Sequence, residues 1–213
     1  PHHPAKTFLI YKSYENRLRV LQQVHFEKGG GGEIDLVLLV NGIPVVTMEL
    51  KTDNTQSIDD AVYQYKHDRK PNRATRPLLN PGRCLVHFAV SSREVMMTTE
   101  LNGTDTVFLP FNQGTQQGRA GNPDNPNGYN VSYLWEWVCS PDLLLRILKD
   151  YALWEPSTKG NEGRLIFPRF HQLRSVERVT SDIVDNGTGK RYLIQHSAGS
   201  GKTKTIAWMA HRA

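Results

Sequence analysis

The stretch of sequence that decides the fold is residues 33–51, which read EIDLVLLVNGIPVVTMELK. Residues 33–40 are rich in Val, Leu and Ile, which favour β-strands, and Asn41-Gly42 is the residue pair that most strongly predicts a two-residue hairpin turn. Residues 45–51 then read as the returning strand, with Pro44 at its start, where a missing N–H is tolerated. We therefore expect an antiparallel hairpin.

Three ionisable side chains interrupt this apolar hairpin. Asp35 lies in the first strand, and Glu49 and Lys51 are two residues apart in the second, so they share a face. Two neighbouring carboxylates suit Mg²⁺, and a lysine beside the metal can stabilise charge on a phosphate under attack. The pattern predicts a metal site, although a salt-bridged sheet edge without catalytic function would show the same spacing.

The pairing register of the hairpin tests this prediction. A tight two-residue loop would pair Val40 with Ile43, and so Asp35 with Met48, which puts Asp35 and Glu49 on opposite faces of the sheet. An offset of one residue, from a G1 bulge at the turn or a three-residue loop, places Asp35 opposite Glu49. We predict that offset.

The rest of residues 1–154 predicts a mixed β-sheet flanked by helices, an α/β fold. Residues 57–68 have helical spacing, with Thr55 or Ser57 as N-cap and acidic residues in the first turn. Ser140-Pro141 starts a second helix. The remaining elements are strands at 84–90 and 94–101 and a long loop at 102–130.

The composition changes after residue 154. Residues 155–164 read as a linker, and 165–213 as the start of an ATP-binding domain, with a helix at 172–184 and a strand at 192–195. Next comes a phosphate-binding pattern that opens a helix, where backbone N–H groups cradle phosphates. In it, Lys202 would reach the β- and γ-phosphates and Thr203 would hold Mg²⁺. The pattern consists of Gly199, Gly201, Lys202 and Thr203, with His196 where the full pattern has glycine.

Charge permits a polyanionic partner without requiring one. Lys and Arg number 26 against 21 acidic residues, giving a net charge of +5. Basic residues just after the 57–68 helix are expected to contact the DNA backbone, although a solvated helix end would look the same. These residues are Lys66, Arg69, Lys70 and Arg73.

The sequence shows no apolar run of bilayer length and no secretory signal. Its two cysteines, Cys84 and Cys139, lack metal-ligand spacing and read as buried free thiols. We therefore expect a cytoplasmic protein without a membrane partner.

Asp35 followed by Glu49-Leu50-Lys51 resembles the PD-(D/E)xK nuclease motif, with Ile34 in place of the proline. The wider sequence resembles the nuclease domain of the restriction (R, motor) subunit of type I restriction enzymes, over nearly the whole chain. The segments that carry this resemblance are 34–38, 41–44, 49–51, 60–69, 87–90, 97–99, 108–112 and 121–123.

The resemblance implies a restriction-endonuclease-like fold followed by the first strand, P-loop and helix of a RecA-like motor of superfamily 2. Asp35, Glu49 and the Leu50 carbonyl would bind Mg²⁺, and Lys51 would be catalytic. Gln64 matches the glutamine of a Gln-x-x-x-Tyr element, although Asp68 stands at the tyrosine position. Residues 167–172 resemble an adenine-reading element in which Gln172 recognises the base.

The implied function is Mg²⁺-dependent DNA cleavage, coupled in the full protein to ATP-driven translocation along double-stranded DNA. The implied partners are the modification (M) and specificity (S) subunits. Two alternatives remain: a catalytically silent DNA-binding or assembly module, and a DNA-repair helicase–nuclease. The acidic motif and arginine finger that ATP hydrolysis needs do not occur in the sequence, so we expect an internal fragment that binds ATP weakly or not at all and does not hydrolyse it.

Overall fold

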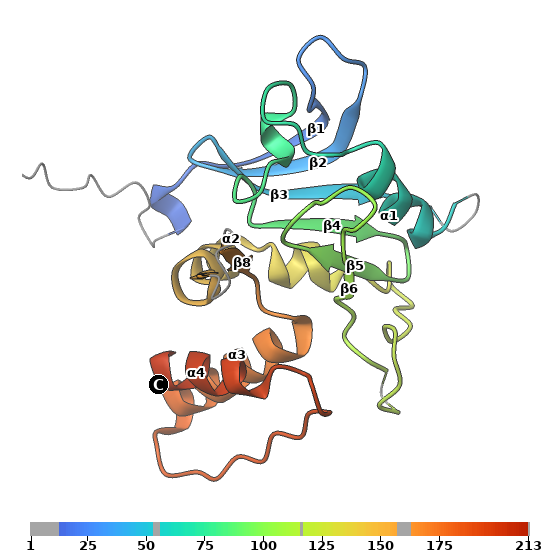
Figure 1. The fold of residues 1–213 in the computed structure, drawn as a ribbon. Coiled ribbons are helices and arrows are strands. Elements are labelled where there is room, and N and C mark those ends of the chain that lie inside the picture. Colours follow the sequence, from blue (N-terminus) through green and yellow to red (C-terminus); the bar gives the residue numbers. More distant parts are fainter. Residues whose placement is uncertain (1–12, 53–55, 116, 157–162, 213) are drawn as a thin grey trace, which may run out of the picture.

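The computed structural model describes residues 13–52, 56–115, 117–156 and 163–212. Its centre is a six-stranded sheet in the order β1-β2-β3-β4-β5-β6 (Figure 1). Strands β3 and β4 pair in parallel and all other neighbours pair antiparallel, so the predicted mixed sheet is confirmed. The strands are β1 (Leu18–His25), β2 (Glu33–Val40), β3 (Ile43–Leu50), β4 (Val86–Val90), β5 (Val95–Thr98) and β6 (Leu109–Pro110).

The helices follow the sequence signals closely. The first main helix begins after Ser57, whose backbone N–H donates to Asp60 Oδ2 at 2.7 Å, and Pro141 opens the second, as predicted. Thr55, the other expected cap, lies outside the described residues. The helices are α1 (Ile58–His67), α2 (Pro141–Arg146), α3 (Phe170–Asn186) and α4 (Lys202–Arg212). Shorter helical turns are η1 (Ser13–Glu15), η2 (Pro77–Leu79), η3 (Leu134–Val138) and η4 (Ile147–Tyr151).

The sheet buries a different apolar cluster on each face. The smaller cluster lies under α1 and includes Ala61, Tyr65 and Ala89. The larger one joins the other face to α2, η4 and the C-terminal helices, which lie below the sheet in Figure 1. Because α1 covers the face that carries Thr47 and Glu49, the candidate site lies on the side of the smaller cluster.

The predicted boundary at 155–164 does not separate two cores in the described residues. Phe167 and Phe170 belong to the same buried cluster as Phe88 and Phe111 of the sheet, with ring centroids 5.7–6.0 Å apart. The ends of the expected linker pair as the strands β7 (Leu153–Glu155) and β8 (Arg164–Ile166). Residues 157–162 lie outside the described residues.

The predicted strand at 192–195 is wrong. This segment has no regular secondary structure, and no described strand runs beside it. A β-strand needs a neighbour to satisfy its backbone N–H and C=O groups, so the β-prone residues alone do not form one. The first strand of a RecA-like sheet is therefore missing from the observed fold.

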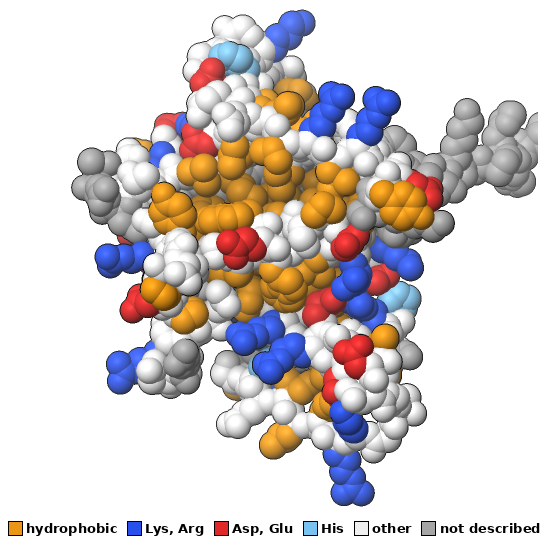
Figure 2. All heavy atoms as spheres, turned by 180° about the vertical axis from the view of Figure 1, so that it is seen from behind, with side chains coloured by type: hydrophobic (Ala, Val, Ile, Leu, Met, Phe, Trp, Pro, Cys, Tyr) orange, Lys and Arg blue, Asp and Glu red, His pale blue; other side chains and the backbone are white. Residues whose placement is uncertain are grey.

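The molecular surface differs between the two ends of the molecule. Figure 2 shows hydrophobic side chains gathered over the upper half, where the sheet lies, with Lys and Arg side chains around and below them. The exposed apolar side chains include Val20, Leu21 and Ile43 on β1 and β3. Among the described helices, none combines the length and apolar character that crossing a membrane requires. Both cysteines are free thiols, Cys84 buried and Cys139 half-buried.

Candidate metal and nucleic-acid site

The β2–β3 hairpin has the predicted one-residue offset, although its origin differs from the expected one. The turn is a tight two-residue loop in which Asn41 and Gly42 have φ values of 53° and 85°, and Val40 pairs with Ile43. The register then shifts between Leu38 and Leu39, so that Leu36 pairs with Met48. Continuing that register sets Asp35 opposite Glu49 on one face of the sheet. The offset is therefore made by a bulge inside the strands.

The Asp35 carboxylate is held by one backbone and one side-chain donor. The Leu50 N–H donates to Oδ2 at 2.7 Å, and the Gln23 side-chain amide donates to Oδ1 at 3.2 Å. Gln23 lies in β1 and has a φ of 49°, in the left-handed region that non-glycine residues rarely adopt. Such strained residues cluster at functional sites. Sequence reasoning missed Gln23, whose only signal is a glutamine within an apolar stretch.

Glu49 is a buried carboxylate with one oxygen left over. Its side chain is 1% exposed, and Arg69 Nε donates to Oε1 at 2.7 Å. Oε2 is buried and has no hydrogen-bond partner among the described residues. Burial raises the pKa of Glu49 from 4.5 to about 7, although the charges of Arg69 and, to a smaller extent, Lys51 lower it. A buried, unpaired carboxylate oxygen is costly, so this atom calls for a ligand.

Lys51 and Leu50 follow directly from the hairpin. Lys51 is half-buried, and its N–H donates to the Val90 carbonyl at 2.8 Å, which fixes its backbone to the end of β4. It lies two residues after Glu49, and its charge acts on the Glu49 carboxyl. Leu50 is bound to Asp35 through its N–H, which brings its peptide group to the same site.

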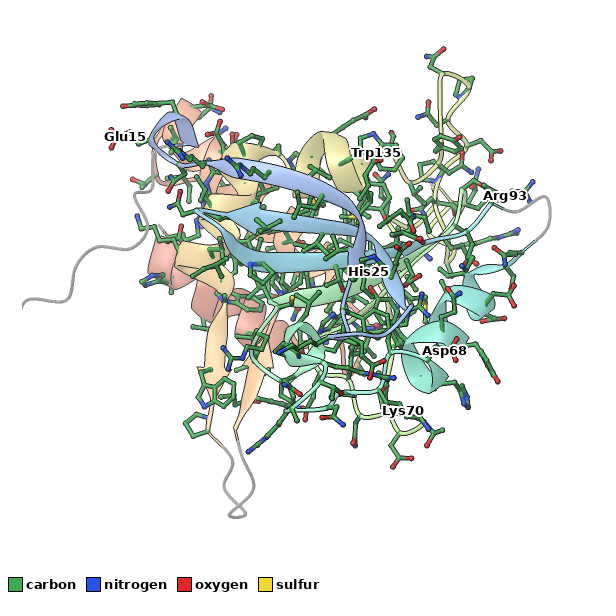
Figure 3. The ribbon with its side chains drawn as sticks, turned by 90° about the horizontal axis from the view of Figure 1, so that it is seen from above. Glu15, His25, Asp68, Lys70, Arg93 and Trp135 are labelled. Carbon is green, nitrogen blue, oxygen red and sulfur yellow. The ribbon has the colours of Figure 1, made fainter. Side chains whose placement is uncertain are left out.

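Gln64 lies on α1, the helix that covers this face. Its Oε1 is buried and has no hydrogen-bond partner among the described residues. Asp68, at the expected tyrosine position, is exposed just after the helix, as Figure 3 shows. The neighbouring Tyr65 is fully buried instead, and its hydroxyl contacts Thr47 Oγ1 at 2.8 Å. Thr47 Oγ1 also contacts His87 Nδ1 at 2.7 Å, which makes a buried polar network beside Glu49.

The residues present fit a magnesium ion. No group of three or more His, Cys, Asp or Glu side chains forms a metal cluster in the part of the chain that the structure describes. Mg²⁺ commonly uses one or two carboxylates and completes its shell with water. Asp35 and Glu49 lie on neighbouring strands, and Glu49 Oε2 has no hydrogen-bond partner among the described residues, so the two carboxylates supply such a set.

The basic residues after α1 divide into surface and inward-facing groups. Lys70 and Arg73 are exposed and Lys66 is half-buried, and Figure 3 shows Lys70 beyond the end of α1. Arg69 does not lie on the surface as expected for a phosphate contact. Its guanidinium is 11% exposed and turns back to the sheet, where it binds Glu49.

The phosphate-binding pattern forms a loop before α4, without its preceding strand. Gly199 and Gly201 have φ values of 72° and 81°, and Lys202 Nζ donates to the carbonyls of His196 and Ser197 at 3.2 and 2.9 Å. Gln172 is buried, and its amide donates to the Gly201 carbonyl at 3.0 Å. A cavity of about 760 Å³ is lined by Gln172, Gly199, Gly201 and Thr203, together with residues of the 97–109 segment.

Comparison with known proteins agrees with this geometry. A family model described as the N terminus of the type I restriction enzyme R protein (HSDR_N) matches residues 5–106, which include the whole β2–β3 hairpin and α1. The SauCOLORF180P type I restriction enzyme endonuclease subunit of Staphylococcus aureus (strain COL) is 26% identical over 200 residues, covering 93% of this chain and 20% of that protein.

A second similar protein comes from another organism. The putative type I restriction enzyme MjaVIIIP endonuclease subunit of Methanocaldococcus jannaschii is 23% identical over 209 residues, covering 94% of this chain and 19% of that protein. The chain thus spans about a fifth of the length of these curated relatives. Residues 5–106, which include the hairpin and α1, thus match the N terminus of type I restriction enzyme R proteins, and curated endonuclease subunits are similar along nine-tenths of the sequence.

Proposed function

We propose that this chain carries a Mg²⁺-dependent DNA endonuclease site formed by Asp35, Glu49 and Lys51. The observation that carries the proposal is the hairpin register, which sets Asp35 opposite Glu49 while Glu49 Oε2 has no hydrogen-bond partner among the described residues. A pair of carboxylates maintained only for stability would be expected to satisfy both oxygens with protein donors.

Each residue has a distinct role in the proposed reaction. Asp35, Glu49 and the Leu50 carbonyl would hold Mg²⁺, which when bound activates water and stabilises charge on the phosphate. Lys51 would stabilise the negative charge that develops on the phosphate, or hold the attacking water. Gln64, whose buried Oε1 has no hydrogen-bond partner among the described residues, would orient water or DNA beside the metal.

The wider function is proposed from the relatives, which are named endonuclease subunits of type I restriction enzymes. In the longer subunit, cleavage of double-stranded DNA would be coupled to ATP-driven translocation, with modification and specificity subunits as partners. Gln172, Gly199, Gly201, Lys202 and Thr203 would belong to the ATP site. Lys66, Lys70 and Arg73 would contact the DNA backbone, whereas Arg69 is engaged at Glu49.

Nicking of supercoiled plasmid DNA by the purified chain tests the proposal. We expect nicking that requires Mg²⁺, stops with EDTA, and is lost in Asp35→Ala, while circular dichroism shows an intact fold. Nicking that persists in Asp35→Ala would exclude the site. A chain that binds DNA without any metal-dependent cleavage would instead favour a catalytically silent module.

A further inference from the structure

Arg69 is anchored at three points under the sheet. Its Nε donates to Glu49 Oε1 at 2.7 Å, one terminal nitrogen donates to the Glu33 carbonyl at 2.8 Å, and the guanidinium lies over the Phe26 ring, 5.5 Å from its centroid. Its other terminal nitrogen is 3.8 Å from Asp68. The side chain is therefore fixed in orientation before any ligand arrives.

Arg69 binds a single oxygen of Glu49 in this arrangement. An arginine can bind both oxygens of a carboxylate through two parallel N–H groups. In this structure Nε alone donates to Glu49, at Oε1, whereas the terminal nitrogen on the same side donates to the Glu33 carbonyl. Oε2 consequently stays without a hydrogen-bond partner among the described residues.

We propose that Arg69 is a positioning residue for the metal site: by holding Glu49 Oε1 it fixes the carboxylate so that Oε2 is presented to Mg²⁺. The inference rests on the proposed nuclease site and adds a residue that lies outside the nuclease motif. Removing a group that hydrogen-bonds to a metal-ligating side chain typically lowers metal affinity about 10- to 100-fold.

Arg76 offers a matched control in the same segment. Its guanidinium also lies over Phe26, at 5.4 Å, but it binds Glu27 and the carbonyls of Asp68 and Lys70. Replacing Arg76 thus disturbs the same packing without removing the donor to Glu49.

The test is Mn²⁺ binding by the purified chain, followed by electron paramagnetic resonance of the free ion, since Mn²⁺ takes the same oxygen ligands as Mg²⁺. We expect Arg69→Met to weaken Mn²⁺ binding about 10- to 100-fold. Arg69→Lys should lose less, because it keeps a positive donor for Oε1. Arg76→Met should keep wild-type affinity, even if it lowers the melting temperature.

Unchanged or tighter Mn²⁺ binding in both Arg69 variants would overturn the inference, because Arg69 would then be a purely structural partner of Glu49 or a competitor of the metal. Equal losses in Arg69→Met and Arg76→Met would also overturn it, since general loosening of the segment would explain both. If Asp35→Asn binds Mn²⁺ like wild type, the proposed metal site itself fails, and this inference fails with it. If Arg69→Met does not fold, Arg69→Lys decides the matter alone.

Discussion

The β2–β3 hairpin and the phosphate-binding loop both carry short motifs, yet the two regions hold their polar motif atoms differently. In the hairpin, strands on both sides satisfy the backbone, and one buried oxygen of Glu49 is left without a partner among the described residues. In the loop, Lys202 Nζ and the Gln172 amide donate to the loop's own carbonyls. The hairpin therefore leaves a carboxylate oxygen for a ligand, whereas the loop uses its lysine and the Gln172 amide to hold its own backbone.

The largest expected effect comes from removing one lysine from each region. Lys51→Ala should lower the Mg²⁺-dependent nicking rate at least about 100-fold, the usual loss for a group that stabilises transition-state charge. Lys202→Ala should leave nicking by this chain unchanged, since Lys202 contacts only its own loop among the described residues. Plasmid nicking rates at saturating Mg²⁺ measure both. Equal losses in the two variants would mean that the regions are coupled in this chain.

The second effect concerns how folding stability depends on pH. Burial lowers the pKa of His87 from 6.5 to about 4, so the fold favours the neutral ring. The buried neutral ring contributes to the free energy of unfolding. This contribution is fully present above pH 6.5 and is lost as the pH falls towards 4, because the unfolded chain binds a proton on His87 that the folded chain does not. At about 1.36 kcal/mol per pKa unit, the loss of folding stability is about 3 kcal/mol.

Urea unfolding of wild type and His87→Asn at pH 7 and pH 4 measures this loss. The stability difference between the two proteins should shrink by about 3 kcal/mol at pH 4, while shifts from other groups such as Glu49 cancel in the difference. His196→Asn, in the segment before the phosphate-binding loop, is the comparison and should show a smaller change in the same direction, because partial burial and the Lys202 charge also lower the pKa of His196. A constant difference between wild type and His87→Asn would contradict the burial of a neutral ring.

A smaller effect on stability is expected from replacing two buried threonines, one in each region. Thr47→Val removes the hydroxyl that contacts both Tyr65 and His87, which leaves the buried Tyr65 hydroxyl without that partner at a cost of about 1–3 kcal/mol. Within the described residues, the Thr205 hydroxyl in α4 makes one contact, at 3.5 Å to the Gly201 carbonyl, so Thr205→Val should cost less than about 1 kcal/mol. Chemical denaturation of both variants ranks them, and the reverse order would show that the loop is the more tightly constrained region.

The smallest effect is expected at Gln23. Gln23→Gly loses the 3.2 Å bond to Asp35 but adopts a φ of 49° without strain, so the two changes should offset each other to within about 1 kcal/mol. Thermal unfolding measures this balance. A large loss of stability would show that the Gln23 side chain is a main support of Asp35.

The register of the β2–β3 hairpin was predicted correctly from the local pattern. The offset of the hairpin follows from requiring Asp35 and Glu49 to share a face, and it is observed. Its source was not predictable, because the bulge opposite Leu38 and Leu39 depends on how both strands pack on the rest of the sheet. Strand β1 went unpredicted since most of its side chains are exposed at the sheet edge, so it lacks an alternating pattern.

The features that could not be predicted depend on contacts between residues far apart in the chain. The inward position of Arg69 could not be predicted from the basic residues around it, because its partners Glu49 and Glu33 are 20 and 36 residues away in the chain. The strand expected at 192–195 fails for the same reason, since a strand requires a neighbour that local sequence does not reveal.

The aromatic core shared by the sheet and the C-terminal segment affects the solubility of the protein. A chain shortened at residue 154 would lose Phe167 and Phe170 and leave the rings of Phe88 and Phe111 facing water. Large exposed apolar patches promote aggregation. The part of the chain before residue 154 would therefore be poorly soluble on its own.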